Sequence, residues 1–314
     1  MTVDGIRLNM LDAQLAHTYS IVARDPETGE MGVAVESHYF AVGSAVTWAE
    51  AGVGIVATQA LVEPAYGQLG LDLMRAGKSA PDTLTGLVAS DAANAVRQVA
   101  MVDAEGRAAA HTGASTIAEA GHIIGEGFSV QANMMLRPTV WPAMAETYQS
   151  AKGELVDRLL AVLDAAEGEG GDIRGRQSAA ILVVSGHNTG RPWFDTIYDI
   201  RVDDSSEPLV EIRRLVSVAR AYTHMRQARS AMVRGDFDAF NREFDAAARL
   251  IGDNPEMRFW HAIGLLAAGK IEQGIEILRH VAARDRNWIT LALRLPAALL
   301  PPNPVVIEQI RTLA

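Results

Sequence analysis

The chain has 314 residues and contains no cysteine. This absence excludes disulfide bridges, thiolate metal sites and a cysteine nucleophile. The eight histidines show no His-Glu-x-x-His or similar spacing, which a zinc site would need. Gly52 and Gly54 match part of a dinucleotide-binding pattern, but they precede an apolar strand instead of following one. The sequence therefore indicates neither a metal nor an organic cofactor.

Long apolar runs are also missing, although 49% of the residues are hydrophobic. No run approaches the roughly 20 residues that a membrane-spanning helix needs. The first 17 residues contain Asp4, Arg7 and Asp12 and lack the continuous apolar segment of a secretory signal. We therefore expect a cytoplasmic protein without a membrane partner, long enough to bury one large or two modest cores.

Basic residues are few in the first two thirds of the chain. Residues 1–213 carry 14 basic and 28 acidic side chains, whereas residues 214–314 carry 14 and 10. The acidic balance argues against a nucleic-acid groove in the first part. In the last part the arginines are interspersed with Asp and Glu, which is typical of solvated helix faces. We expect a small-molecule substrate and no nucleic acid.

The pattern of the sequence divides the chain into three parts. Residues 1–17 form an extension without strong periodicity, residues 18–214 alternate strand-like and helix-like segments, and residues 215–314 are helical. Strands in hairpins with paired helices between them favour an α+β fold over a doubly wound parallel sheet. The predicted strands are 53–58, 96–102, 107–111, 179–184 and 195–202, and the predicted helices are 65–76, 80–90, 139–151 and 154–166.

The last third of the chain has the pattern of paired helices. Small residues such as Ala262, Gly264 and Gly274 occur where helices would pack, and one helix starts after Asn254-Pro255, which resembles tetratricopeptide units. Fewer units are visible than the three or so that such an array needs. We therefore expect a structural appendage that packs on the first domain, on a second subunit of a homodimer, or on its own last helix. The predicted helices are 208–233, 237–251, 255–268, 271–283 and 304–313.

The second part opens with the pattern of a β-hairpin. Apolar and β-branched runs within 18–26 and 29–37 are joined by a turn that contains proline and glycine. Thr18 opens the first strand and Ser37 closes the second. This layout resembles the start of an N-terminal nucleophile (Ntn) hydrolase. In that superfamily a Thr, Ser or Cys at the head of a strand attacks an amide, and its own α-amine serves as the base.

The resemblance extends from about residue 18 to about residue 215. One uncharacterised bacterial and archaeal family with an Ntn-hydrolase-like fold has similar segments in the same order. The matching segments are Ser37–Gly43, Gly52–Gln59, Arg97–Gln98, His111–Gly113, Gln131–Met134, Gly171–Ala180 and Arg201–Asp204. These motifs are specific for the family and much less specific for function. The resemblance implies a four-layer αββα sandwich, which the helical domain follows here.

The resemblance makes Thr18 the candidate nucleophile. A threonine hydroxyl needs a base within hydrogen-bond reach, and a free α-amine with a pKa of about 8 can be that base. Without the resemblance, Thr18 would be interpreted as a β-forming residue that enters a strand. Here 17 residues precede Thr18, so the α-amine exists only if the His17–Thr18 bond is cut. His17 lacks the flexibility of glycine, which disfavours spontaneous cleavage.

Further polar residues flank the ends of predicted strands. Ser37 is a second candidate catalytic hydroxyl, and the neighbouring His38 could contact the substrate or be a partly buried structural histidine. Asn133 could donate a hydrogen bond to an oxyanion or cap a turn. His111 is interpreted as a strand-end residue with its hydrogen bonds satisfied, and not as a base.

The run Gly170–Ser178 places charges next to an apolar strand. Asp172, Arg174 and Arg176 need partners or a ligand there, because burying an unpaired charge is costly. One interpretation is an ion pair between Asp172 and an arginine that shapes the loop. The other is a clamp that binds a substrate carboxylate, with Ser178 as a further contact.

Two functions from different classes remain open. In the first, the protein is an Ntn-type amidohydrolase that cleaves a linear C–N bond: Thr18 attacks, Asn133 and backbone N–H groups hold the oxyanion, and the loop arginines bind an acidic group of the substrate. In the second, Thr18 is never liberated, and the protein is a catalytically silent binding or scaffolding module with a helical interaction tail. We expect one cleft to collect Thr18, Ser37, His38, Asn133, Arg176 and Ser178.

Overall fold

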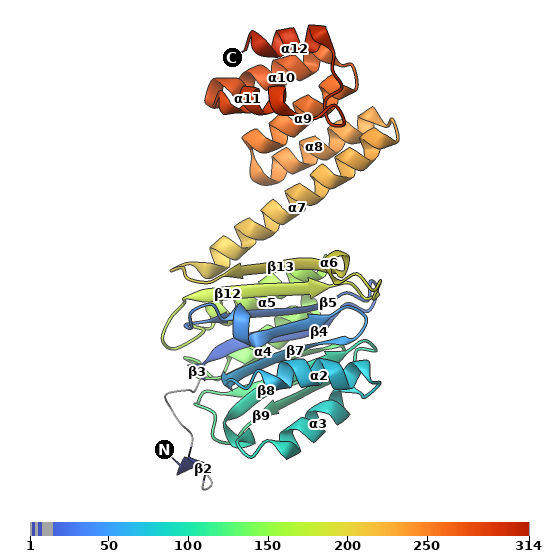
Figure 1. The fold of residues 1–314 in the computed structure, drawn as a ribbon. Helices are drawn as coiled ribbons and strands as arrows, with labels where there is room; N and C mark the ends of the chain where they lie inside the picture. The colour runs from blue at the N-terminus through green and yellow to red at the C-terminus, as the bar shows by residue number, and fades with distance from the viewer. Residues whose placement is uncertain (1, 4–5, 8–14, 314) are drawn as a thin grey trace. The chain divides into compact units, whose positions relative to one another are not determined.

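The computed structural model describes residues 2–3, 6–7 and 15–313 (Figure 1). The chain divides into two compact units, Met1–Arg214 and Leu215–Ala314. Most of the extension predicted at residues 1–17 lies outside the described residues. Its described parts are His17 and three short strands, β1 (Thr2–Val3), β2 (Ile6–Arg7) and β3 (Leu15–Ala16), of which β1 and β2 pair with each other.

The first sheet of the first unit is built around the predicted hairpin. β4 (Thr18–Arg24) and β5 (Met31–Ser37) pair in a register that sets Thr18 opposite Ser37. The turn between them includes Gly29, whose φ of 74° lies in the left-handed region that favours glycine. In the described chain the strand order is β10 (Gly121–Gly125), β11 (Phe128–Ala132), β4, β5, β12 (Ser178–Val184) and β13 (Thr196–Val202), with antiparallel neighbours throughout.

The second sheet is also antiparallel, and two short strands pair with the same side of its strand β7. β7 (Gly54–Leu61) pairs with β8 (Arg97–Asp103), which pairs with β9 (Ala108–Thr112). Two short strands share the other side of β7. β6 (Thr47–Glu50) pairs with residues 54–57, and β3 pairs with residues 60–61. The end of the extension is therefore an edge strand of this sheet.

The two sheets enclose an apolar core between them. Successive strand residues point to opposite faces, and Val22, Val33 and Val35 of the first sheet pack in one cluster with Ile55 and Ala100 of the second. Helices cover the outer faces (Figure 1). They are α4 (Val140–Ser150) and α5 (Leu155–Gly168) on the first sheet, and α2 (Ala65–Arg75) and α3 (Ala80–Ser90) on the second.

Short helices connect elements of the first unit, and further helices form the second unit. The connecting turns are α1 (Gly43–Val46), the 3₁₀ helix η1 (Asn94–Val96) and α6 (Pro192–Asp195). α7 begins in the first unit and continues into the second. The remaining helices are α7 (Pro208–Val233), α8 (Phe237–Ile251), α9 (Pro255–Ala267), α10 (Ile271–Arg284), α11 (Asn287–Arg294) and α12 (Pro304–Arg311).

Local sequence explains where these helices begin and how they approach one another. The Asn254 side chain accepts hydrogen bonds from the N–H groups of Glu256 and Met257, and Pro255 occupies the first helical position of α9. A Cβ atom added to Gly264 would lie 2.4 Å from Cζ of Phe240. The small residue therefore lets α9 approach the buried aromatic side chains of α8.

The predicted α+β character is confirmed by this arrangement. The hairpin, the predicted strands and the predicted helices all coincide with elements of the structure, apart from shifts at their ends. The sequence did not predict β10 and β11. Gly121, Gly125 and Gly127 interrupt the apolar pattern there, and the pairing with β4 supplies the strand partners that local sequence does not show. Across the described residues, every helix is too short or too polar to cross a membrane.

Candidate functional site

The head of the hairpin brings polar side chains into the layer between the sheets. By strand alternation Thr18, Ser20 and Ser37 point into this layer, where Ser20 bonds to Gln59 of the second sheet. Tyr19 points to the opposite face, toward α5. All of these side chains are buried, so their polar atoms need partners inside the protein.

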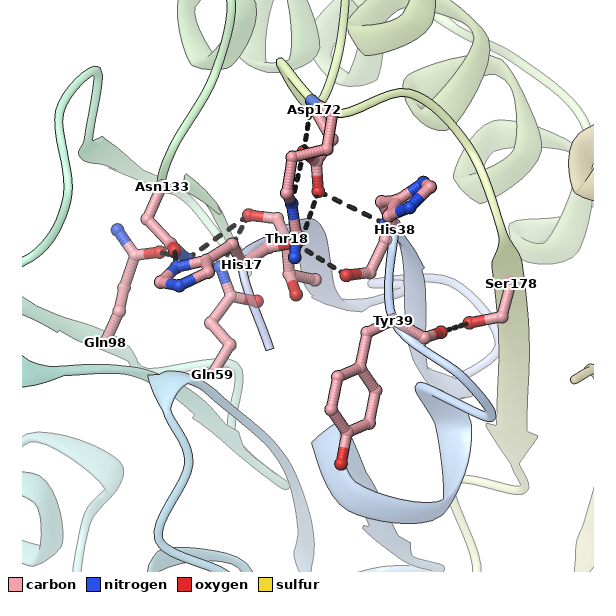
Figure 2. Close-up of polar contacts among 11 residues, drawn as sticks. His17, Thr18, His38, Tyr39, Gln59, Gln98, Asn133, Asp172 and Ser178 are labelled. Atoms are coloured by element: carbon pink, nitrogen blue, oxygen red, sulfur yellow. Dashed lines mark hydrogen bonds and ion pairs between the residues drawn. The ribbon is translucent and has the colours of Figure 1, made fainter. Parts of the chain in front are cut away.

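A network of buried amides holds the main chain at Thr18 (Figure 2). The Thr18 carbonyl oxygen accepts hydrogen bonds from the Asn133 N–H at 3.0 Å and from Gln59 Nε2 at 3.2 Å. Gln98 Oε1 accepts from Gln59 Nε2 at 2.7 Å and from Asn133 Nδ2 at 2.9 Å. Ser20 Oγ donates to Gln59 Oε1 at 2.6 Å. Both sheets therefore fix the position of the Thr18 peptide.

The Thr18 side chain is an exception in this network. Its Oγ1 is buried and has no hydrogen-bond partner among the described residues. Buried hydroxyls are usually paired, and leaving one unpaired costs about 1–3 kcal/mol. The hydroxyl belongs to the same dipeptide as the His17 carbonyl carbon. The hydroxyl of Thr18, the candidate nucleophile, therefore takes part in no hydrogen bond within the described part of the chain.

The His17 carbonyl oxygen accepts two strong hydrogen bonds. Ser37 Oγ donates at 2.6 Å and Arg174 Nη2 donates at 3.0 Å. The serine hydroxyl is buried and the guanidinium is charged, and both conditions strengthen the pull on the carbonyl electrons. Two donors on one carbonyl oxygen form the arrangement that stabilises an oxyanion when the carbon is attacked.

The His17 side chain is enclosed beside this carbonyl. It is 4% exposed, and its Nδ1 lies 2.9 Å from Oδ1 of Asn133. Burial lowers the pKa of His17, and the hydrogen bond to Asn133 opposes this effect only in part. The ring is therefore neutral near pH 7. Because an amide oxygen can only accept, Nδ1 carries the proton.

Two residues next to this network have left-handed backbone. Ala60 has a φ of 68° and follows Gln59, and Met134 has a φ of 59° and follows Asn133. For a residue with a Cβ this conformation costs roughly 1–2 kcal/mol, and such residues gather at functional sites. The two amides that contact the Thr18 carbonyl are thus held at a cost to stability.

The loop before β12 supplies the guanidinium. The Asp172 carboxylate is enclosed and accepts from Arg174 Nη2 at 2.7 Å and Nε at 3.0 Å, and from the His38 N–H at 3.2 Å (Figure 2). Asp172 and Arg174 therefore form the ion pair that is one of the two interpretations of this loop. The same Nη2 reaches the His17 carbonyl, so Asp172 orients the donor.

Other predicted residues lie around this centre with different partners. Arg176 forms ion pairs with Glu167 and Glu207. Ser178 Oγ donates to the Tyr39 carbonyl and accepts from the Val42 N–H, which holds the turn after β5. The structure thus gathers Thr18, Ser37, Asn133, Asp172 and Arg174 around the His17–Thr18 peptide, and places His38 and Ser178 at the adjoining turn and Arg176 on acidic partners.

Tyr19, which follows Thr18, and Glu36, which precedes Ser37, lie on the other face of the sheet. The Tyr19 hydroxyl donates to Glu167 Oε2 at 2.9 Å. Neither carboxyl oxygen of Glu36 has a hydrogen-bond partner within the described part of the chain. Burial, with the nearby charge of Glu167, raises the pKa of Glu36 to about 8. Glu36 is therefore mostly a neutral acid at pH 7.

Sequence reasoning did not assign functional roles to Gln59, Gln98, Ser20 or Glu36. Each is a polar residue inside an apolar strand, and that interruption is the signal that could have found them. His111, interpreted as a satisfied strand residue, bonds through Nε2 to the Asn94 carbonyl. In residues 2–3, 6–7 and 15–313, no three His, Asp or Glu side chains are grouped so that they could hold a metal ion.

Comparison with known proteins places the chain in a family. The model of the family of unknown function DUF1028 matches residues 18–212, and the match begins at Thr18. The crystal structure of protein SPO2555 from Silicibacter pomeroyi, which carries the same family model, is 31% identical, with a TM-score of 0.57 over 63% of this chain and 87% of that chain. No curated protein matches significantly. Because the family model covers more than half of its residues, the chain belongs to the DUF1028 family of unknown function.

Proposed function

We propose that the protein is an Ntn-type amidohydrolase that cleaves a linear C–N bond, with Thr18 as its nucleophile once the His17–Thr18 bond has been cut. The observation that carries the proposal is the pairing of a buried, unpartnered Thr18 hydroxyl with a His17 carbonyl that Ser37 and Arg174 polarise. Two facing antiparallel sheets with helices on their outer faces support the four-layer αββα sandwich of that superfamily.

The first step is cleavage of the chain by its own nucleophile. Thr18 Oγ1 attacks the His17 carbonyl carbon, and the negative charge that develops on the carbonyl oxygen is stabilised by Ser37 Oγ–H and Arg174 Nη2–H. The C–N bond breaks, the proton of the hydroxyl ends on the Thr18 nitrogen, and an ester joins His17 to Thr18 Oγ1. Water hydrolyses this ester and leaves a carboxylate on His17 and a free α-amine on Thr18.

The second reaction uses the same groups on a substrate. The Thr18 α-amine accepts the hydroxyl proton and passes it to the leaving amine, while Ser37 and Arg174 hold the oxyanion. Water then attacks the acyl-enzyme, which returns Thr18 and releases the acid. Asn133 acts as a positioning residue here, because its N–H and Nδ2 face the Thr18 carbonyl instead of the reacting carbonyl.

The sequence assigned both loop arginines to an acidic group of the substrate, but Arg174 has another role in this proposal. It lies on the reacting carbonyl, whereas the guanidinium of Arg176 is engaged by Glu167 and Glu207. Asp172 keeps Arg174 in place through a bidentate contact. His38 and Ser178 support the site through the backbone of the adjoining turn.

Intact mass spectrometry of the purified full chain over several days tests the proposal. We expect a product that begins at Thr18, loss of that product in Thr18→Ala, and slow formation in Thr18→Ser. Removing one oxyanion donor typically lowers a rate by about 10²–10³, so Ser37→Ala and Arg174→Gln should slow cleavage to that extent. Ser150→Ala is the matched control, because Ser150 is an exposed hydroxyl at the end of α4.

A chain that stays intact and shows no amidase turnover would contradict the hydrolase. It would favour the alternative, an Ntn-fold binding module that acts through its helical tail. The tail fits a tetratricopeptide-like appendage, because Gly264 and Gly274 stand where a Cβ would collide with Phe240 and Leu266. Small residues at such contacts let helix pairs pack closely.

A further inference from the structure

We infer that residues 15–17 occupy the acyl-side subsites of the enzyme, and that the processed protein cleaves peptides whose acyl side binds as an extended strand along β7. This inference rests on the proposed function and gives it a substrate class. The extension then serves as the first substrate of its own site. Its contacts show what a later substrate must offer.

The backbone of the extension is held by strand pairing. Leu15 and Ala16 pair antiparallel with Leu61 and Ala60 of β7, and the residue that follows carries the polarised carbonyl. β6 covers the same side of β7 only at residues 54–57. Departure of the extension therefore leaves the end of β7 with an unpaired edge. Such an edge binds extended peptides through main-chain hydrogen bonds, largely without regard to their sequence.

Side-chain contacts at two positions add selectivity. Ala16 is fully buried and belongs to the core cluster between the sheets, so a large side chain at the equivalent substrate position would have to displace packed atoms. His17 is enclosed and meets the amide oxygen of Asn133 at 2.9 Å. The acyl residue next to the cleaved bond should therefore bear a hydrogen-bond donor, and the residue before it should be small.

The polarising groups also predict how the product behaves. Hydrolysis converts the reacting carbonyl into a carboxylate and releases the amine, with one water consumed. The carboxylate would then face the charged guanidinium of Arg174 and the hydroxyl of Ser37, which are the partners of the present carbonyl. A charge-assisted contact of this kind is stronger than a neutral one. A peptide that ends in Leu-Ala-His should thus bind the processed site through its terminal carboxylate.

The test uses the cleaved protein, which begins at Thr18, after dialysis has removed residues 1–17. Its probes are coumarin amides of acetyl-Gln-Leu-Ala-His, of acetyl-Gln-Leu-Trp-His, and of acetyl-His alone. We expect kcat/KM for the first amide to exceed the values for the other two by at least about tenfold, because the second amide loses the small residue before the histidine and the third loses the strand pairing with β7. Calorimetric titration with acetyl-Gln-Leu-Ala-His as carboxylate and as carboxamide gives a readout without turnover, and the carboxylate should bind at least severalfold more tightly.

The outcomes separate this inference from the function on which it rests. A processed chain that cleaves all three amides equally, and binds neither peptide, would contradict binding of the acyl side along β7. It would not contradict the proposed amidohydrolase activity. Absence of any Thr18-dependent cleavage would overturn both. Selective turnover of the first amide, with tighter binding of the carboxylate, would support both.

Discussion

Glu36 is a carboxylic acid whose charge the fold disfavours. Its pKa is about 8 in the folded chain against 4.5 for an exposed glutamate. Between these values the folded protein keeps a proton that the unfolded chain releases. The stability that Glu36 contributes is therefore fully present below pH 4.5 and is lost as the pH rises toward 8.

We expect Glu36→Gln to remove this pH dependence, because glutamine resembles the protonated acid and does not titrate. The free energy of unfolding of the wild type should fall by a few kcal/mol relative to the variant between pH 5 and pH 8. Urea unfolding followed by circular dichroism at several pH values measures the difference. For Glu126→Gln, at an exposed turn, the free energy of unfolding should depend on pH as it does in the wild type. A constant gap between wild type and Glu36→Gln would show that the carboxyl is already ionised at pH 5.

The left-handed conformation of Ala60 gives a second prediction at the residue scale. Glycine adopts this conformation without a Cβ penalty, but it gains entropy in the unfolded chain. The two effects are similar in size, so Ala60→Gly should be within about 1 kcal/mol of the wild type or more stable. Ala57→Gly, in the same strand and outside the left-handed region, should cost about 1 kcal/mol or more. Urea midpoints compare the two, and equal losses would contradict the assigned backbone strain.

At the scale of elements, glycines decide how closely α2 approaches β6. A Cβ atom at Gly67 would lie 2.2 Å from Cδ2 of Trp48, whereas a Cβ at Gly86 in α3 would meet nothing within 4 Å. The Trp48 ring is fixed in part by a hydrogen bond from Nε1 to the Ala45 carbonyl at 3.2 Å. The same substitution should therefore have opposite effects in two neighbouring helices.

We expect Gly67→Ala to lower the free energy of unfolding by about 1–3 kcal/mol or more through overpacking. Gly86→Ala should raise it by up to about 1 kcal/mol, because alanine is the better helix former where space is open. Thermal melts of the two variants beside the wild type measure both shifts. If Gly67→Ala were as stable as Gly86→Ala, α2 would not pack on Trp48 as the structure shows.

At the scale of the whole molecule, each unit has its own apolar clusters. The clusters of the first unit draw on residues 16–184, and those of the second on residues 221–313. Cores that share no residues can unfold in separate transitions. Gly264→Ala, which would push a Cβ to 2.4 Å from Phe240, should then lower only the transition of the second unit. Differential scanning calorimetry of the full chain checks this, and equal shifts of every transition would show that the units unfold together.

Local sequence determined most of the elements of this chain. Alternating apolar runs around a Pro- and Gly-bearing turn predicted β4 and β5, and Asn254-Pro255 predicted the start of α9. These signals involve residues that are close in sequence, and the forces behind them act over a single turn or strand. β10 and β11 were not predicted, because the pairing of β11 with the distant strand β4 is not visible in the local sequence.

Within the candidate site, sequence predicted residue types but not their partners. Thr18, Ser37 and Arg174 were singled out by position, yet only the tertiary structure put Ser37 and Arg174 on one carbonyl oxygen. It also turned Arg176 toward acidic partners. A long side chain in a loop can reach several carboxylates, and the choice among them depends on packing that local sequence does not encode.

The sequence by itself determined a hairpin headed by Thr18, an α+β first unit and a helical second one, because strand alternation, caps and helix periodicity are local properties. Only the tertiary structure decided that Gln59, Gln98 and Asn133 meet behind the Thr18 carbonyl and that residues 15–16 join β7. The contacts behind the Thr18 carbonyl join segments from two sheets, across separations of up to 115 residues. They form only when burial of the apolar core brings the sheets together, since buried amides gain stability from one another only after water has been excluded.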